Sequence, residues 1–335
     1  MNYVDKADQN GYTQTVILLK QIFCRCGSAF GRFVLRQGAA HRQKAVRQGG
    51  VNGHGTPHPC RFFRKGQTDM KAVLIPGDGI GREIAQSVRK ISDVLATGIE
   101  WEEYAAGAEY AAEHGELLQP GALDAIEEYG WALKGPTATP IGKGFRSINV
   151  QLRQRFNTYA NLRPVRTLPG VPTRFENVDL VIVRENTEDL YKGIEYMLND
   201  EIANGVKLIT KPACERICRF AFDYAAANGR KKVTAVHKAN IMKLTDGMFL
   251  STFREVAKDY PAIEADDCII DALCMKLVQK PEQFDVLVAP NLYGDIISDL
   301  CAGLVGGLGF APSANIGAKT RIYEAVHGSA PDIAG

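Results

Sequence analysis

The chain has 335 residues, of which 45% are hydrophobic and 23% are charged, and its formal net charge is +2. This is the composition of a globular protein with one large or two medium domains, and no apolar run approaches the roughly 18 residues that span a bilayer. From Met70 onward there are 29 basic and 35 acidic residues, which argues against a nucleic-acid-binding protein and leaves no expected nucleic-acid or membrane partner.

Residues 1–69 differ from the rest of the chain. They hold 11 basic and only 3 acidic residues and show no sustained apolar period. One interpretation is an organelle transit peptide, because such peptides are arginine-rich and acid-poor. The other is an extension that is disordered or not native, with the folded protein starting at Met70. We favour the second and expect a cytoplasmic protein; the mitochondrial matrix is the alternative.

From Met70 the pattern alternates between strands and helices. The apolar run 72–76 enters the glycine turn "GDGIG" (77–81), and a helical period follows over 82–98. The turn lacks the G-x-G-x-x-G spacing of a dinucleotide fingerprint, so we interpret it as a tight strand-to-helix reversal. Further strands are expected within 131–140, 178–185, 231–240 and 284–290, with helices at 247–260 and 291–307. This alternation predicts an α/β fold, and residues 191–210 read as an extended arm.

The span 144–166 is rich in arginine, and no acid lies between its outer arginines. Ser147 stands where a helix would begin, so an N-cap is the plain alternative to a binding role. Arg163 precedes a proline and Arg184 ends an apolar strand, so both have a rigid backbone. Arg153, Arg163 and Arg184 would suit a small substrate with several carboxylates.

Other segments carry candidate proton-transfer and metal groups. Tyr191 lies close to Arg184 and would serve as a general acid, or simply pack; Lys238 directly follows a strand, where a lysine is better placed for catalysis than on open surface. Asp295 and Asp299 are spaced i, i+4 on one helical face among apolar neighbours. Their mutual repulsion favours a hard cation such as Mg²⁺ or Mn²⁺.

Six segments, in order, resemble those of the β-decarboxylating dehydrogenases, the family of isocitrate and 3-isopropylmalate dehydrogenases. They are "GDGIG", "NLRPVR", "RENTEDLY", "VHKANIMK", "NLYGDIISDLCAGLVGGLGFAPSANIG" and "EAVHGSAPDIAG". The resemblance covers Met70 to Gly335. It implies a large cofactor-side α/β domain (70–158 and 306–335), a small substrate and dimer domain (159–305) with an intersubunit clasp (189–210), and a fold unlike the standard Rossmann arrangement.

The resemblance also implies the chemistry. These enzymes oxidise the 2-hydroxyl of a malate-type acid, pass hydride to NAD(P), lose CO₂ and reprotonate the enolate. The substrate carboxylates would be held by Arg153, Arg163 and Arg184. Tyr191 would protonate the enol and Lys238 would help to remove the hydroxyl proton. The metal would be bound by Asp271, Asp295 and Asp299. In this family Lys238 and Asp271 act from the neighbouring subunit, so a homodimer or higher oligomer is expected.

The substrate and cofactor follow from further matches. Isocitrate dehydrogenases carry S-x-N-x-x-L-R, with the serine and asparagine against the substrate's γ-carboxylate, and Ser147 and Asn149 occupy those places. Isopropylmalate enzymes have apolar residues there, so isocitrate is predicted. The alternatives are a 3-isopropylmalate, homoisocitrate or tartrate dehydrogenase, and a non-catalytic regulatory subunit. The expected cofactor residues are Thr139, His327, Gly328, Asp332 and Ile333.

The choice of NAD rests on Asp332 followed by Ile333, where NADP-specific relatives tend to carry lysine and then tyrosine. An acid at that place binds ribose hydroxyls and repels a 2′-phosphate. Thr139 matches a threonine near the nicotinamide. Arg82 replaces the proline that usually follows "GDGIG". Because the family continues beyond the position of Gly335, we expect this sequence to be truncated on its cofactor side.

Overall fold

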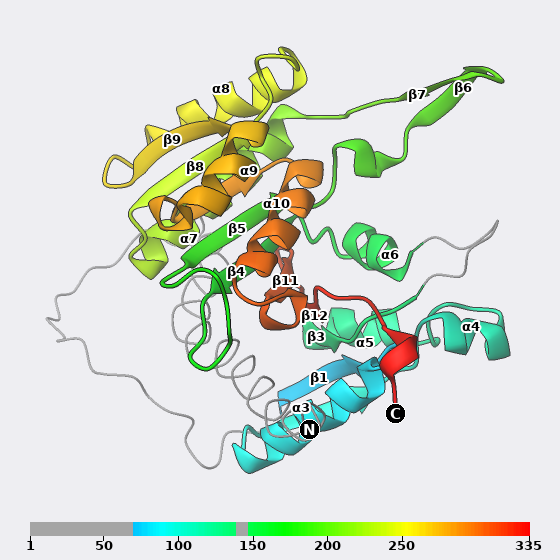
Figure 1. Cartoon of the computed structure of the whole chain (residues 1–335). Helices are drawn as coiled ribbons and strands as arrows, with labels where there is room; N and C mark the ends of the chain where they lie inside the picture. The colour runs from blue at the N-terminus through cyan, green and yellow to red at the C-terminus, as the bar shows by residue number, and fades with distance from the viewer. Residues whose placement is uncertain (1–69, 139–146) are drawn as a thin grey trace, which may run out of the picture.

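A computed structural model describes residues 70–138 and 147–335 of the chain. These residues form a ten-stranded sheet with helices on both faces and a separate two-stranded hairpin (Figure 1). The strand order in the large sheet is β2-β1-β3-β12-β11-β4-β5-β10-β8-β9. The predicted α/β fold is therefore confirmed.

The strands and helices have the following bounds. The large sheet consists of β1 (Met70–Ile75), β2 (Ile99–Glu103), β3 (Trp131–Lys134), β4 (Ala160–Arg166), β5 (Asp179–Glu185), β8 (Lys232–His237), β9 (Glu264–Ile269), β10 (Val286–Ala289), β11 (Pro312–Ile316) and β12 (Arg321–Ala325). The hairpin consists of β6 (Glu195–Asn199) and β7 (Ile202–Gly205). The α-helices are α3 (Gly81–Val94), α4 (Ala108–His114), α5 (Ala122–Tyr129), α6 (Ile148–Arg155), α7 (Lys211–Asn228), α8 (Thr245–Ala257), α9 (Ile270–Gln279) and α10 (Asn291–Leu304).

The sheet has two halves that follow the chain. Strands from residues 70–158 and 306–335 occupy the order β2-β1-β3-β12-β11, and strands from residues 159–305 occupy β4-β5-β10-β8-β9. Pairing is parallel toward both edges and antiparallel in the middle, where β12, β11, β4 and β5 run side by side. The halves correspond to the two predicted segments, although their assignment as domains stays a prediction.

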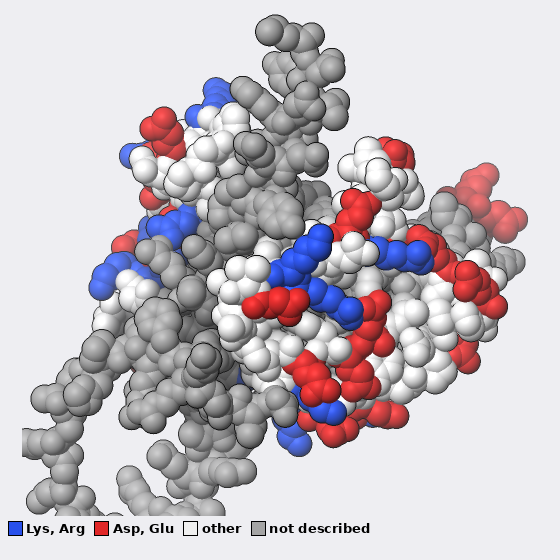
Figure 2. All heavy atoms as spheres, turned by 90° about the horizontal axis from the view of Figure 1, so that it is seen from below, with Lys and Arg blue, Asp and Glu red and all other residues white. Residues whose placement is uncertain are grey.

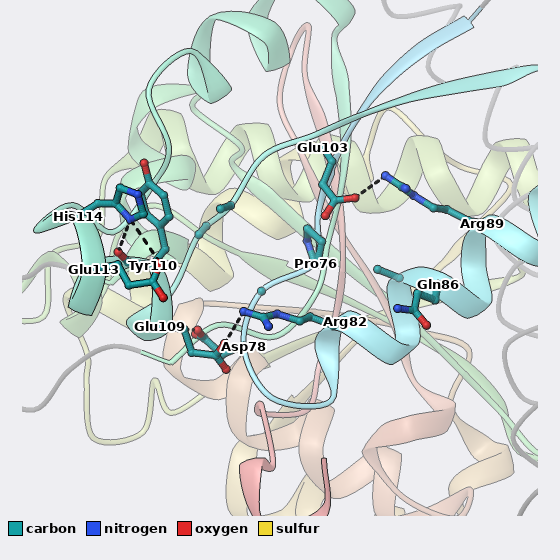
Figure 3. Close-up of a pocket in the computed structure, with 14 residues that line it drawn as sticks. Pro76, Asp78, Arg82, Gln86, Arg89, Glu103, Glu109, Tyr110, Glu113 and His114 are labelled. Atoms are coloured by element: carbon teal, nitrogen blue, oxygen red, sulfur yellow. Dashed lines mark hydrogen bonds and ion pairs between the residues drawn. The ribbon is translucent and has the colours of Figure 1, made fainter. Parts of the chain in front are cut away.

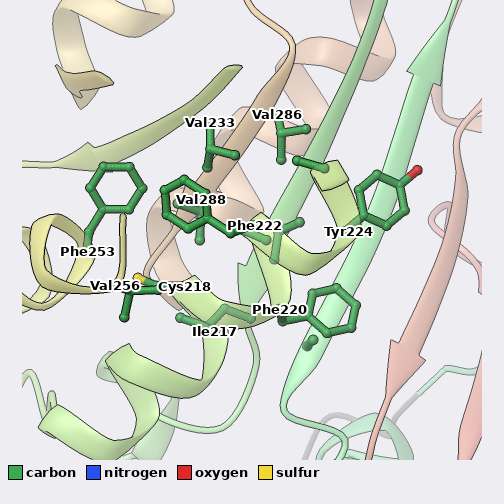
Figure 4. Packing of buried hydrophobic residues seen from close by; sticks show 14 of the residues in the cluster. Ile217, Cys218, Phe220, Phe222, Tyr224, Val233, Phe253, Val256, Val286 and Val288 are labelled. Atoms are coloured by element: carbon green, nitrogen blue, oxygen red, sulfur yellow. The ribbon is translucent and has the colours of Figure 1, made fainter. Parts of the chain in front are cut away.

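The half from residues 159–305 has three layers, with α7 and α8 on one face of the sheet and α9 and α10 on the other. The strands alternate between the two faces: Val181 and Val183 pack with α7 and α8, whereas Leu180 and Ile182 pack with α9 and α10. Figure 4 shows Val233, Val286 and Val288 of the neighbouring strands in the first of these clusters. The central strands β5, β10 and β8 are buried on both sides here, which explains their continuous apolar runs.

The "GDGIG" turn packs tightly against the loop after β3. Gly77 has φ +79°, and a Cβ built on it would lie 2.0 Å from the carbonyl oxygen of Pro136. A Cβ on Gly81 would lie 2.2 Å from the carbonyl oxygen of Pro76. Close backbone approach therefore explains the glycines. Asp78 is buried, and its carboxylate accepts hydrogen bonds from the backbone N–H groups of residues 108, 109 and 138, so it holds the start of α4 and the loop after β3 together.

The β6–β7 hairpin projects away from the rest of the chain (Figure 1). Its large apolar side chains are exposed, among them Tyr196, Met197, Leu198 and Ile202. The expectation of an extended arm at residues 191–210 is thus confirmed in shape, and its role as a clasp stays a prediction.

The surface charge is mixed. On the face seen from below in Figure 2, lysine and arginine side chains are interspersed with acidic ones rather than forming one continuous basic area. Within the described part of the chain, none of the helices combines the length and the apolar character that crossing a membrane requires.

Candidate active site

Arg163 and Arg184 lie on one face of neighbouring strands. In the β4–β5 register Arg163 lies opposite Ile182, and Asn161 lies opposite Arg184. Opposite side chains share a face, as do side chains two residues apart on one strand, so the two arginines lie on the same face. Ile182 packs with α10 on that face. Both arginines are almost fully buried, with 6% and 1% exposure. Pro164 follows the β4 residues that pair with β11. At this position β4 has only β5 beside it, which is where a strand tolerates a proline.

Helix α10 is able to approach Arg184 because residue 294 is glycine. A Cβ on Gly294 would lie 2.5 Å from the Cγ of Arg184. We therefore expect Gly294→Ala to lower the free energy of unfolding by about 1–3 kcal/mol through overpacking. Gly303→Ala is the matched control on the same helix, because nothing lies within 4 Å of its built Cβ; it should stabilise the chain by about 0.5–1 kcal/mol. Urea unfolding of both variants measures the effect, and equal stabilities would contradict it.

The two arginines contact the two aspartates of α10. Arg184 donates to Asp295 through Nη1 and to Asn291 Oδ1 through Nε at 2.9 Å. Arg163 Nη1 lies 3.3 Å from Asp299 Oδ1. Burial lowers the pKa of Arg184 to about 10, although Asp295 opposes this shift. Burial acts to raise the pKa of Asp295, but Arg184, Tyr191 and Arg163 together outweigh it and hold that pKa below its usual value.

Tyr191 completes this group. It stands on a short 3-10 turn (Leu190–Lys192), its hydroxyl donates to Asp295 Oδ2, and the guanidinium carbon of Arg184 lies 5.0 Å from its ring centroid. Asp189 fixes the turn, since its carboxylate accepts from the backbone N–H groups of Leu190 and Leu292 at 2.9 Å. Burial and the Asp295 hydrogen bond raise the pKa of Tyr191, so the phenol stays protonated at neutral pH.

Sequence reasoning missed Glu324 and Lys134, which are buried beside the arginines. Glu324 lies 3.5 Å from the Nζ of Lys134 and 3.7 Å from the Nη2 of Arg153. Burial lowers the pKa of Lys134, whereas Lys134, Arg153 and a hydrogen bond from Asn315 together hold the pKa of Glu324 down against its own burial. The available signal was weak: one charged residue at or near the end of each of two short strands, β3 and β12.

Helix α6 carries the residues that were predicted to select the substrate. Asn149 and Arg153 are spaced i, i+4, which places them on the same side of the helix. Ser147 occupies the N-cap position, but its side chain makes no capping hydrogen bond. Asn149 Oδ1 is buried without a hydrogen-bond partner in the described part of the chain. The capping alternative for Ser147 is therefore not what the structure shows.

Lys238 and Asp271 lie apart from this group. They form an exposed ion pair with each other at 2.5 Å. Among the residues that the structure describes, neither side chain contacts the arginines or the α10 aspartates. The sheet order explains this, because Lys238 follows β8 and Asp271 follows β9, toward the far edge from β4 and β5. A single chain thus does not bring all predicted site residues together.

The sequence of residues 71–335 matches the family model described as isocitrate/isopropylmalate dehydrogenase. The chain belongs to this family. It is similar to mitochondrial NAD isocitrate dehydrogenase catalytic subunit 5 of Arabidopsis thaliana (52% identity over 277 residues, 82% of this chain and 74% of the relative). It is equally similar to chloroplastic 3-isopropylmalate dehydrogenase of Solanum tuberosum (53% over 282 residues, 82% and 79%). The crystal structure of isocitrate dehydrogenase from Methylococcus capsulatus superposes with a TM-score of 0.76 at 50% identity, covering 79% of each chain.

Members of this family act on isocitrate or related substrates, and the family implies a divalent metal ion and a nicotinamide cofactor. The α10 carboxylates of Asp295 and Asp299 are oxygen donors of the kind that Mg²⁺ and Mn²⁺ prefer. No cluster of three or more potential ligands occurs among the described residues of one chain. In addition, Arg163 and Arg184 already neutralise the two aspartates, so charge repulsion between them no longer argues for a cation.

The predicted cofactor residues of this family member lie at the end of the chain. Asp332 and Ile333 belong to a 3-10 turn (Pro331–Ile333), and both are exposed. His327 Nδ1 contacts the carbonyl oxygen of Gly328 at 2.9 Å. The segment packs on the "GDGIG" turn, where the N–H of Ile80 donates to the carbonyl of residue 329 at 3.0 Å. The remaining predicted contact, Thr139, lies outside the described residues.

A pocket of about 480 Å³ lies on another part of the molecule, between α3 and α4 (Figure 3). Its charged lining is internally paired, with Arg82 on Glu109 and Arg89 on Glu103. None of the predicted site residues that the structure describes lines it, and its paired charges favour no particular ligand.

Proposed function

We propose that the chain catalyses the metal-dependent oxidative decarboxylation of isocitrate to 2-oxoglutarate, with hydride transfer to NAD⁺. The observation that carries this proposal is the polar start of α6, where the Ser147 side chain makes no capping bond and Asn149 follows in the first turn of the helix. The Ser147 hydroxyl and the Asn149 Nδ2 amide are hydrogen-bond donors that suit a third carboxylate, and both would be poor neighbours for an isopropyl group.

The chemistry assigns a task to each side chain. The buried forks of Arg163 and Arg184, with Arg153, hold the substrate carboxylates. Lys238, supplied by a second copy of the chain, takes the proton of the substrate hydroxyl. Hydride leaves the carbon that bears this hydroxyl and passes to the nicotinamide. The β-carboxylate then departs as CO₂, and the electrons of the broken carbon–carbon bond form the enolate of 2-oxoglutarate. Tyr191 protonates the carbon.

A bound divalent metal would be held by Asp295, Asp299 and the Asp271 of the second copy. It would supply Lewis-acid stabilisation of negative charge on the substrate oxygens. This arrangement explains why Lys238 and Asp271 lie apart from the arginines in one chain. Exposed apolar side chains on α9 and α10, among them Met275, Val278 and Ile296, favour a homodimer or higher oligomer.

The cofactor is proposed to be NAD, because the exposed carboxylate of Asp332 suits ribose hydroxyls and would repel a 2′-phosphate. For localisation, the plant relatives named above are mitochondrial or chloroplastic, so the cytoplasmic expectation has no support from the comparisons. We retain the mitochondrial matrix alternative.

Two alternatives remain in view. A 3-isopropylmalate dehydrogenase is favoured by the similarity to the Solanum tuberosum enzyme. A non-catalytic regulatory subunit of isocitrate dehydrogenase would need neither Tyr191 nor Lys238, which makes it the weaker alternative.

The test is NADH or NADPH formation by the full chain with Mg²⁺, given isocitrate or 3-isopropylmalate and NAD⁺ or NADP⁺ in parallel. We expect turnover of isocitrate with NAD⁺. Ser147→Ala combined with Asn149→Leu should lower kcat/KM for isocitrate by about 100-fold, because a substrate carboxylate loses its partners. Arg155→Gln is the control on the same helix, since Arg155 is exposed and pairs with Glu127. Turnover of 3-isopropylmalate alone would refute the substrate, and turnover of neither by a folded dimer would favour the regulatory subunit.

A further inference from the structure

A row of polar side chains crosses one face of five adjacent strands in the middle of the sheet. Strand register places them together: Lys134 pairs with Glu324, Ser313 with Glu324, Asn315 with Asn161, and Asn161 with Arg184. Residues 161, 313, 315 and 324 are all nearly inaccessible to solvent. Buried amides and carboxylates cost free energy unless they are paired, and apolar residues would pack here without that cost. The row therefore calls for an explanation other than stability.

Asn315 lies at the centre of this row. Its Oδ1 accepts hydrogen bonds from the side-chain amides of Asn161 and Asn186, both at 2.9 Å. Because the oxygen is occupied by two donors, the Nδ2 faces Glu324 and donates to its Oε1 at 2.7 Å. Asn186 is held in turn by the carbonyl of Thr158 at 3.0 Å, so the amide of Asn315 has a single orientation.

The bond from Asn315 is the closest polar contact of the Glu324 side chain in the described part of the chain. The cations Lys134 and Arg153 lie farther away, at 3.5 Å and 3.7 Å. Such distances attract without fixing a direction, whereas the hydrogen bond at 2.7 Å fixes the carboxylate. The carboxylate position then sets the point toward which Arg153 is attracted, whereas the Nζ of Lys134 is held more closely by the carbonyl oxygen of Gly135, at 2.9 Å. Arg153 is a proposed substrate ligand, so the row connects the core of the sheet to the anion site.

We propose that Asn315 is a positioning residue, which holds the Glu324 carboxylate and thereby sets the place of Arg153 at the substrate site. This inference rests on the proposed function for its kinetic consequences. Asn315 itself does not touch the substrate. It acts on binding rather than on a proton or hydride transfer, so its loss raises KM and leaves kcat largely unchanged.

The first test compares Asn315→Asp with Ser313→Ala in the full chain. Aspartate has the same shape but, when ionised, cannot donate to Glu324. Ser313 is the matched control, since it is on the same strand and face, is equally buried, and among the described residues its side chain bonds only Asn161. Asn315→Asp should raise KM for isocitrate about tenfold or more and change kcat less than about threefold. Ser313→Ala should leave both within about twofold. A KM within twofold of wild type for Asn315→Asp, or equal effects of the two variants, would overturn the proposal.

A second variant separates positioning from general stability. Asn315→Asp combined with Glu324→Gln keeps a hydrogen bond and the same net charge but moves the charge away from Arg153 and Lys134. We expect its melting temperature to recover relative to Asn315→Asp, while KM stays raised. Recovery of KM together with the melting temperature would mean that the row is only structural, and the proposal would fail.

The two proposals fail in different ways. If the folded wild-type chain turns over neither substrate, the proposed function fails, and the positioning role is then decided by the crystal structure of Asn315→Asp. A shift of the Glu324 carboxylate by about 1 Å or more relative to Arg153 supports it, because displacements of that size matter at binding sites. An unchanged carboxylate overturns it.

Discussion

Replacing Arg184 by glutamine is expected to lower kcat/KM for isocitrate by about 100- to 1,000-fold. Arg184 is 1% exposed and donates to both Asp295 and Asn291. Its removal leaves the Asp295 carboxylate with Arg163 at 3.9 Å as its nearest cation among the described residues. Losing one partner of a buried, hydrogen-bonded charge pair costs about 2–5 kcal/mol, and a substrate carboxylate would lose its fork as well. Steady-state kinetics measures the loss.

Two further variants make this result interpretable. Arg166→Gln lies on β4, where Arg166 is partly exposed and pairs with Asp179 at 3.5 Å, so it should change kcat/KM by less than about twofold. Arg184→Lys keeps the charge without the planar fork and should fall between wild type and Arg184→Gln. Circular dichroism establishes that each variant is folded. If a folded Arg184→Gln keeps kcat/KM within fivefold of wild type, Arg184 holds no substrate carboxylate.

Tyr191→Phe is expected to lower kcat by about 10²- to 10³-fold, the usual effect of removing a positioned general acid. The phenol is protonated at neutral pH and hydrogen-bonded to Asp295, next to Arg184. KM should change much less, because the ring remains in place. Deuterium incorporation into 2-oxoglutarate, measured by NMR in D₂O, provides a second readout: its stereospecificity should be lost.

The control for this variant is Tyr196→Phe. Tyr196 is similarly exposed and lies nearby in the chain, on the β6–β7 hairpin. It should leave kcat unchanged. A Tyr191→Phe enzyme that keeps kcat within threefold and still protonates one face of the product would show that another group is the acid.

Local pattern was sufficient for much of the fold. The apolar run before "GDGIG" predicted β1, and the apolar period after it predicted α3, because both elements bury a face that repeats within a few residues. The i, i+4 spacing of Asp295 and Asp299 correctly placed both on one helix, α10. It did not reveal that Arg163 and Arg184 would lie against them, since that contact depends on how β4 and β5 pack against α10.

The amino-acid sequence by itself determined the family, the α/β class and most of the side chains proposed for chemistry, because these reside in short contiguous motifs. Tertiary structure decided what surrounds them. Glu324 and Lys134 are separated by 190 residues and become neighbours only because β12 inserts beside β3. Asn315 reaches Glu324 because β11 pairs with both β12 and β4. Strand order likewise separates Lys238 and Asp271 from the arginines. Sheet pairing is set by burial across the whole domain, and no local window of sequence contains that information.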